Sequence, residues 1–264
     1  MQLAGKKAII TGGASNIGRA TARAYAEQGA SVVILDIQDD RGAQAASEIN
    51  QTEGGKAKYF HCDVSKSQEV KNVIMQSIDH LGGIDILAAV AGGTAFFTHP
   101  QDITEEQLDR ILGINLKGTI FCNQAVYQAM KECGGGAIIN FGSSAGLVPI
   151  GVADYGAAKG GIIAWTRHCA KAWGPDNIRV NTVCPSAQGR DPNPTSTTNR
   201  SKLDDAELKA FQEHAKRILE SKALRRAGNT DEDLVPTMVF LASEAARYMT
   251  GQLFIVDGGY VMSR

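Results

Sequence analysis

The chain has 264 residues, of which 43% are hydrophobic and 21% charged, and its formal net charge is −1. This is the composition of an ordinary globular protein, and the near-neutral charge argues against a nucleic-acid partner or a basic membrane surface. No stretch reaches the roughly 18 apolar residues of a membrane span, and the N-terminus lacks the apolar segment of a signal peptide. We therefore expect a single cytoplasmic α/β domain over residues 1–264, with no membrane partner.

The five cysteines are scattered along the chain, odd in number and without a Cys-x-x-Cys pair. This pattern predicts neither a disulfide framework nor a zinc site, and it fits a reducing cytoplasm. We expect no metal site. The cysteines are Cys62, Cys122, Cys133, Cys169 and Cys184.

The first segment with a chemical meaning is a glycine-rich turn. Residues 7–11 form a short apolar run, residues 12–18 are rich in glycine, and residues 19–28 have helical spacing. Strand, turn and helix in this order are typical of the entry to a dinucleotide-binding unit, where a pyrophosphate meets a helix N-terminus. A plain strand–helix connection has the same pattern, so the turn alone does not distinguish a cofactor-binding turn from an ordinary connection. The residues expected at the cofactor are Gly12, Ser15, Asn16, Ile17 and Gly18.

The next expected strand, residues 30–35, ends in Asp36. An acid about 20 residues after the glycine-rich turn accepts hydrogen bonds from an adenosine ribose. Its charge would repel the 2′-phosphate of NADP, and neither Ser15 nor Ile37 supplies a cation for that phosphate. The pattern therefore predicts NAD, with Asp36 and Ile37 at the ribose. The alternative is that Asp36 caps the following helix.

Helices and strands continue to alternate, and the strands are almost wholly apolar. This predicts a parallel sheet covered on both faces. Asp63-Val64 follows one strand, where Asp63 either meets the adenine amino group or caps the next helix. Ala91-Gly92 follows another strand and suits a close approach of the cofactor. The expected helices are 39–51 and 68–81, and the expected strands are 57–62 and 84–90.

In the second half, a helix expected at 104–112 is interrupted at 114–118 and resumes to Met130. The strand 135–141 then ends at Gly142-Ser143-Ser144-Ala145-Gly146. Because open parallel sheets bind ligands outside the carboxyl ends of their strands, Ser143 should reach the same edge as the glycine-rich turn. A serine pair after a strand is also common in plain turns.

Tyr155-Gly-Ala-Ala-Lys159 begins a long helix that meets no proline before Pro175. Residues four apart lie on one helix face, so Tyr155 and Lys159 should point the same way. A phenol has a pKa of about 10, and a nearby ammonium lowers it. Such a pair can exchange a proton with an alcohol or a carbonyl. The alternative is a chance pair on a solvated helix.

Taken together, these segments resemble the short-chain dehydrogenase/reductase family. The resemblance implies a doubly wound, Rossmann-type parallel sheet of seven strands, with helices on both faces. It also implies NAD-dependent interconversion of a secondary alcohol and a ketone by hydride transfer. The matching segments are Thr11–Gly18, Asp36, Asp63-Val64, Ala91-Gly92, Asn115, Ser143, Tyr155-x-x-x-Lys159, Arg179-Val-Asn181 with Pro185, and Gly251-Gln252 with Val256-Asp-Gly-Gly259.

The resemblance also assigns roles to residues. Tyr155 is implied as the general acid/base, and Lys159 as the group that lowers its pKa and binds the nicotinamide ribose. Ser143 is implied to hold the substrate oxygen, Asn115 to bind a water that links Lys159 to solvent, and Pro185 to contact the cofactor. Two hydroxyl donors and a cation would stabilise the oxyanion character that hydride transfer leaves on the substrate.

The resemblance implies a homotetramer, built through the long helices before and after the Ser143 strand. Tyr127, Trp165 and Trp173 could serve in that interface, or equally in the core. Two other functions stay open: an NADPH-dependent carbonyl reductase, which Asp36 argues against, and a cofactor-binding regulatory protein with decayed catalysis. The complete set of Asn115, Ser143, Tyr155 and Lys159 argues against decay.

The chain departs from the family pattern in three places. Asn16 replaces a glycine, and asparagine tolerates the left-handed backbone needed there. Ala89-Val90 replaces Asn-Asn, which removes hydrogen bonds that support the sheet. Ser186 and Arg190 stand where the family usually has Gly and Thr, so closure of that loop on the cofactor is in question.

A substrate lid is expected at about 186–222, because residues 191–200 are polar and interrupted by proline and a helix follows. A plain surface insertion is the alternative. The expected substrate walls are residues 94–99 and 147–150.

Overall fold

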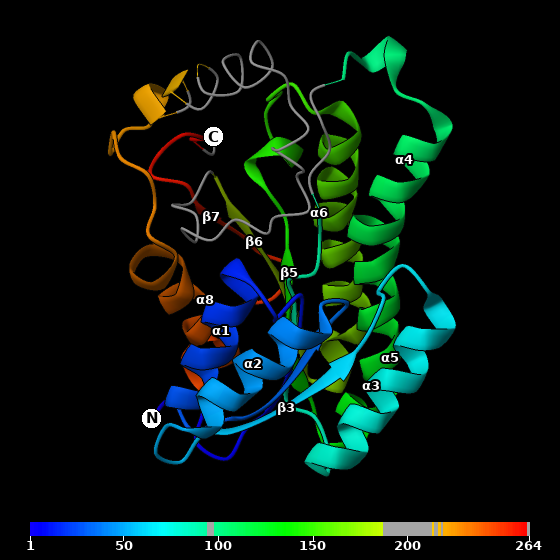
Figure 1. Cartoon of the computed structure of the whole chain (residues 1–264), viewed down its shortest axis with the longest axis vertical. Helices are drawn as coiled ribbons and strands as arrows, with labels where there is room; N and C mark the ends of the chain where they lie inside the picture. The colour runs from blue at the N-terminus through cyan, green and yellow to red at the C-terminus, as the bar shows by residue number, and fades with distance from the viewer. Residues whose placement is uncertain (94–97, 187–212, 214–215, 218, 263–264) are drawn as a thin grey trace.

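The computed structural model describes residues 1–93, 98–186, 213, 216–217 and 219–262. Within these ranges seven strands form one sheet in the order β3-β2-β1-β4-β5-β6-β7, and every neighbouring pair is parallel (Figure 1). The predicted seven-stranded, doubly wound sheet is confirmed. The strands are β1 (Lys7–Thr11), β2 (Ser31–Asp36), β3 (Lys56–His61), β4 (Ile86–Ala89), β5 (Gly136–Phe141), β6 (Ile178–Pro185) and β7 (Leu253–Val256).

Helices cover both faces of the sheet, as Figure 1 shows. Successive strand residues point to opposite faces, so Ile9 packs beneath one layer of helices and Ile10 beneath the other. The apolar runs that predicted doubly covered strands therefore fill two cores. One layer holds α1 (Asn16–Glu27), α2 (Asp39–Asn50) and α8 (Val235–Ala242); the other holds α3 (Ser67–Leu81), α5 (Gly118–Glu132) and α6 (Ala153–Trp173).

The helix between β4 and β5 is interrupted where the sequence pattern breaks. A π-helical turn, Gly113–Lys117, joins α4 (Glu105–Leu112) to α5. Such turns are rare and are often found at functional sites. This one buries Asn115 completely. A second π turn, Thr230–Leu234, precedes α8.

A buried polar network supports the centre of the sheet. The side-chain amides of Asn123 on α5 and Asn140 on β5 bond to each other reciprocally, at 2.9 and 3.0 Å. Asn140 also donates to Thr166 on α6, which in turn accepts from Thr182 on β6. This network bonds strands to helices close to Ala89-Val90, where the sequence predicted lost support.

The three aromatic residues considered for an interface pack on one another within the chain. The rings of Tyr127 and Trp173 lie 5.0 Å apart, and those of Trp165 and Trp173 lie 6.3 Å apart. The Tyr127 hydroxyl also donates to Asp176 at 2.7 Å. Packing inside one chain explains the positions of these three aromatic residues, so they give no evidence about the oligomeric state.

Most of the expected lid, 186–222, lies outside the described residues, and so do Arg190 and positions 94–97 of one expected substrate wall. Ser186 is described and buried, and its hydroxyl donates to the carbonyl of Asp257 at 3.1 Å. Among the described residues, no helix is both long enough and apolar enough to cross a bilayer.

Candidate active site

The turns that follow β1 and β4 meet at the carboxyl edge of the sheet. Gly12 has a φ of +69°, and a Cβ atom placed on it would lie 2.8 Å from the Cα of Ala91. The backbone N–H of Ala91 donates to the Thr11 hydroxyl at 3.1 Å. Glycine is therefore required here for conformation and for space. The two predicted cofactor turns are brought into contact.

The glycine-rich turn leads into α1 as expected. A Cβ atom on Gly18 would lie 2.0 Å from the Gly12 carbonyl oxygen, so no larger residue fits. Asn16 adopts a φ of 45°, which confirms that asparagine takes the left-handed conformation there. Ser15 is the N-cap of α1, and its hydroxyl makes no capping hydrogen bond. Together with the free N–H groups of a helix N-terminus, this turn suits a phosphate group.

Asp36 closes β2 against this turn. One carboxylate oxygen accepts the Ala14 N–H at 3.1 Å, and the other accepts the backbone and side-chain N–H groups of Gln38. The N-cap of α2 is Gln38, so Asp36 does not cap that helix. Ile37 beside it is 53% exposed. Sequence reasoning missed Arg41, whose guanidinium donates to Gln38 at 3.4 Å and places a cation near this carboxylate.

Asp63 and Val64 both make contacts within the chain that stabilise the fold. The Asp63 carboxylate accepts from the backbone and the hydroxyl of Ser65, at 3.0 and 2.7 Å, and lies 3.4 Å from the Lys66 ammonium. Burial raises the pKa of Asp63, but the bonds from Ser65 and Lys66 outweigh it and hold the pKa below its ordinary value. Val64 fills the space beside Gly118. The N-cap of α3 is Lys66 and has no side-chain capping bond, so Asp63 does not cap that helix, and the adenine contact stays a prediction.

The strand β5 delivers Ser143 to the first turn of α6. Ser143 is extended and its hydroxyl accepts the Ala145 N–H at 3.1 Å, at the start of a short 3₁₀ helix, Ser144–Gly146. This 3₁₀ helix lies against α6, where a Cβ atom on Gly146 would sit 2.7 Å from the backbone of Gly160. The Ser143 side chain is close enough to the Tyr155 phenol to lower its pKa in part. The two hydroxyl groups that the sequence assigned to one substrate oxygen are therefore neighbours.

Lys159 is 2% exposed, and its ammonium donates to the Phe141 carbonyl at 2.8 Å. The ammonium nitrogen lies 5.4 Å from the centre of the Tyr155 ring. Burial lowers the Lys159 pKa to about 8. The ammonium of this buried lysine is the cation of the site.

The predicted lowering of the Tyr155 pKa by Lys159 stays a prediction. Burial raises the pKa of Tyr155 to about 12, although part of the residue remains exposed, and the nearby Ser143 side chain opposes this only in part. Burial dominates the Tyr155 pKa because of where the Lys159 ammonium lies. The ammonium lies over the aromatic ring and bonds to Phe141, so desolvation of the phenol dominates.

Asn115 faces Lys159 across Gly92. Its amide group donates to the carbonyls of Gly93 and Ile111, at 2.9 and 3.1 Å. Among the described residues, its oxygen is the one buried side-chain nitrogen or oxygen atom without a hydrogen-bond partner. A Cβ atom on Gly92 would lie 2.7 Å from this oxygen and 3.5 Å from the Lys159 nitrogen. A buried acceptor of this kind is usually satisfied by water, and here the ammonium lies within reach of the same small space.

The comparisons with known proteins agree with this geometry. A family model described as Enoyl-(Acyl carrier protein) reductase matches residues 12–261. The chain belongs to the short-chain dehydrogenase/reductase family. Members of this family are oxidoreductases that use nicotinamide cofactors. The glycine turns at Gly12, Gly18 and Gly92, whose backbones leave no room for side chains, fit such a cofactor.

Several relatives have printed activities. A (−)-isopiperitenol/(−)-carveol dehydrogenase of Mentha piperita is 34% identical over 98% of this chain and 94% of its own length. A 2-(S)-hydroxypropyl-CoM dehydrogenase of Xanthobacter autotrophicus is 36% identical over 95% and 94%. The crystal structure of a short-chain type dehydrogenase/reductase from Mycobacterium marinum superposes with a TM-score of 0.87 at 32% identity, and covers 99% of this chain and 98% of that one.

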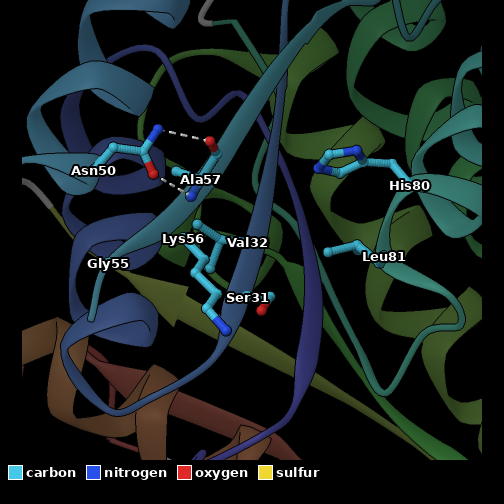
Figure 2. Close-up of a pocket in the computed structure, with 8 residues that line it drawn as sticks. All are labelled: Ser31, Val32, Asn50, Gly55, Lys56, Ala57, His80 and Leu81. Carbon is cyan, nitrogen blue, oxygen red and sulfur yellow. Dashed lines mark hydrogen bonds between the residues drawn. The ribbon is translucent and has the colours of Figure 1, made fainter.

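A separate cavity lies at the opposite edge of the sheet. It has a volume of about 380 Å³ and opens at the first residues of β2 and β3, Ser31 and Lys56 (Figure 2). Asn50 lines it and bonds both the N–H and the carbonyl of Ala57. The far ends of these strands carry Asp36 and His61, so this cavity is not part of the candidate active site.

Proposed function

We propose that this protein is an NAD-dependent dehydrogenase that interconverts a secondary alcohol and a ketone. The observation that carries the proposal is the meeting of the Ser143 and Tyr155 side chains, with the Lys159 ammonium behind them. Because this group stands beside the glycine-rich cofactor turn, a substrate oxygen can be held next to a hydride carrier.

In the proposed mechanism, Ser143 and Tyr155 hold the substrate oxygen with two hydroxyl groups. A nicotinamide cofactor held at the turns of Gly12, Gly18 and Gly92 would supply the hydride chemistry. Tyr155 takes the alcohol proton during oxidation and returns it during reduction. With a pKa of about 12 the phenol is a poor base near neutrality, so turnover requires this pKa to fall when the site is filled. Lys159, charged below a pH of about 8, is the nearby cation that can lower it.

Asn115 and Lys159 are proposed to keep the proton in exchange with solvent. The unpartnered Asn115 oxygen and the Lys159 ammonium border the space beside Gly92. A water held there would accept the proton that Lys159 passes on from Tyr155. This role rests on the geometry of two side chains, one from the π turn that follows α4 and one from α6.

The coenzyme proposal rests on Asp36. Its carboxylate, fixed against Ala14, can accept hydrogen bonds from ribose hydroxyls and would repel a 2′-phosphate. Hydrogen bonds to charged groups are worth about 1.5–3 kcal/mol, and each 1.4 kcal/mol is about tenfold in affinity. We expect a preference for NAD of at least about a hundredfold in kcat/KM. Arg41 is the observation that favours NADPH as the second candidate.

The proposed substrate is a small, largely apolar secondary alcohol. Leu147 and Val148, which follow Ser143, are partly buried and apolar, and would form one wall of the substrate site. By their printed names, one relative is a dehydrogenase of (−)-isopiperitenol and (−)-carveol and another is a dehydrogenase of 2-(S)-hydroxypropyl-CoM. A cytoplasmic location, a homotetramer and a lid at about 186–222 are further proposals.

One experiment tests the reaction. A panel of cyclic, aromatic and sugar-derived alcohols is incubated with NAD or NADP, and reduced cofactor is followed by absorbance. We expect turnover with NAD, and its loss by about 10²–10⁴-fold in Tyr155→Phe with unchanged cofactor binding. Asp36→Ala should weaken the use of NAD and improve that of NADP. Wild-type protein that binds NAD without turning over any alcohol or ketone would identify a regulatory protein instead.

A further inference from the structure

A buried carboxylate next to the catalytic tyrosine has no role in the mechanism above. Asp154 is 3% exposed and directly precedes Tyr155 in the first turn of α6. One of its oxygens accepts the Tyr155 N–H at 2.7 Å, and the other accepts the side-chain amide of Gln107 at 2.9 Å. Both donors are neutral. A hydrogen bond to a carboxylate is roughly twice as strong as one between neutral groups, so the bond from Gln107 is a strong contact between the two helices.

Gln107 belongs to α4, which packs beside α6 (Figure 1). Its backbone N–H donates to the hydroxyl of Thr104, the N-cap of α4, at 3.2 Å. Its side-chain amide reaches Thr98 as well as Asp154, at 3.2 and 2.9 Å. Gln107 therefore connects α4, the segment before it and the catalytic helix at one point.

The spacing of residues links this point to the active site. Gln107, Ile111 and Asn115 follow one another at intervals of four, the interval that places residues on one helix face. The Asn115 amide donates to the Ile111 carbonyl, which fixes Asn115 to the last turns of α4. On α6 the same interval separates Asp154 from Ala158, and Ile111 and Ala158 both belong to the apolar seam between the two helices. The Gln107–Asp154 bond thus lies at one end of a seam whose other end holds Asn115 and Lys159.

We propose that the Gln107–Asp154 hydrogen bond is a register clamp that fixes α4 against α6 and so holds Asn115 opposite Lys159. The seam between the bond and the catalytic residues is apolar, and apolar contact is non-directional, so it permits sliding. The Gln107–Asp154 hydrogen bond requires a defined geometry, so it does not permit sliding. Gln107 and Asp154 are positioning residues. Their effect on turnover rests on the proposed function.

The test exchanges the amide and the carboxylate group between positions 107 and 154. Gln107→Glu places a second carboxylate against Asp154, and should lower kcat about ten- to a hundredfold, because a shift of about 1 Å can cost 10²-fold. Adding Asp154→Asn restores a donor, and the double variant should return to within about threefold of wild type. The KM for NAD should stay within about twofold in all variants, since the adenosine end of the cofactor is bound elsewhere.

The matched control is Gln128→Glu. Gln128 donates to Glu132 at 2.7 Å on the exposed side of α5, so the change in charge and side chain is the same but lies away from the seam. It should leave kcat unchanged. Gln107→Met removes the bond without adding charge, and should lower kcat about tenfold in a protein that still folds.

The outcomes separate the clamp from the proposed function. If the wild type turns over no substrate, the proposed function fails, and the clamp is then decided by whether the double variant regains the Tm lost in Gln107→Glu. If the wild type is active, a fall in Tm without a fall in kcat overturns the clamp, because the bond is then only structural. Failure of the double variant to recover overturns it as well.

Discussion

A single methyl group beside Asn115 should disable the proposed active site. In Gly92→Ala the added carbon would lie 2.7 Å from the Asn115 oxygen and 3.5 Å from the Lys159 nitrogen. The first distance is too short for a Cβ contact, and Asn115 is fully buried and held by two hydrogen bonds. Overpacking costs about 1–3 kcal/mol of stability, and a displacement of about 1 Å can cost 10²-fold in rate. We expect kcat to fall about 10- to 100-fold.

The assay is NADH formation with the best alcohol of the panel, at saturating substrate, with a thermal melt in parallel. Gly113→Ala is the control. Gly113 has a helical φ of −56°, and the nearest atom to its added carbon is 4.0 Å away, so the variant should keep its kcat. It should also gain up to about 1 kcal/mol from helix propensity. A Gly92→Ala protein that keeps more than about a third of the wild-type kcat would refute the role given to this space.

Two further predictions concern buried polar groups. Asn140→Ala removes a side chain with bonds to Asn123 and Thr166, and should lower the free energy of unfolding by about 2–4 kcal/mol in urea melts; a loss below about 1 kcal/mol contradicts the support assigned to this network. The Lys159 pKa is about 8 in the folded chain, against an ordinary 10.5. Between these values the unfolded chain binds more protons, so wild-type stability rises with pH through this window. The Tm of Lys159→Met minus that of wild type should therefore be more positive near pH 7 than near pH 9.5, and an equal difference at both would exclude the shift.

The fold could be predicted from the sequence because its signals are local. Most strands are apolar runs, and the ends of β1, β4 and β5 carry a glycine turn or a hydroxyl group, so their shared edge follows from parallel pairing. The left-handed backbone of Asn16 was also predictable, since few residues tolerate it.

The rest of the site depends on contacts between distant segments. The upward shift of the Tyr155 pKa comes from desolvation by the groups packed around the phenol, and the spacing of residues in the sequence cannot show this. Gln107 and Asp154 are 47 residues apart, and neither belongs to a motif. Arg41 was missed for a similar reason, because it reaches Asp36 only through Gln38.

The π turn at Gly113–Lys117 has a consequence for how this chain can change in length. It amounts to one extra residue inserted in an otherwise α-helical stretch. Deleting one residue there would restore regular α-helix, and would rotate the preceding turns by about 100° relative to α5. Asn115 would then leave the side that faces Lys159, and Gln107 would leave the side that faces Asp154. Deleting any one residue of this stretch other than Asn115 should therefore inactivate the protein as completely as loss of the tyrosine, even though it removes no catalytic group.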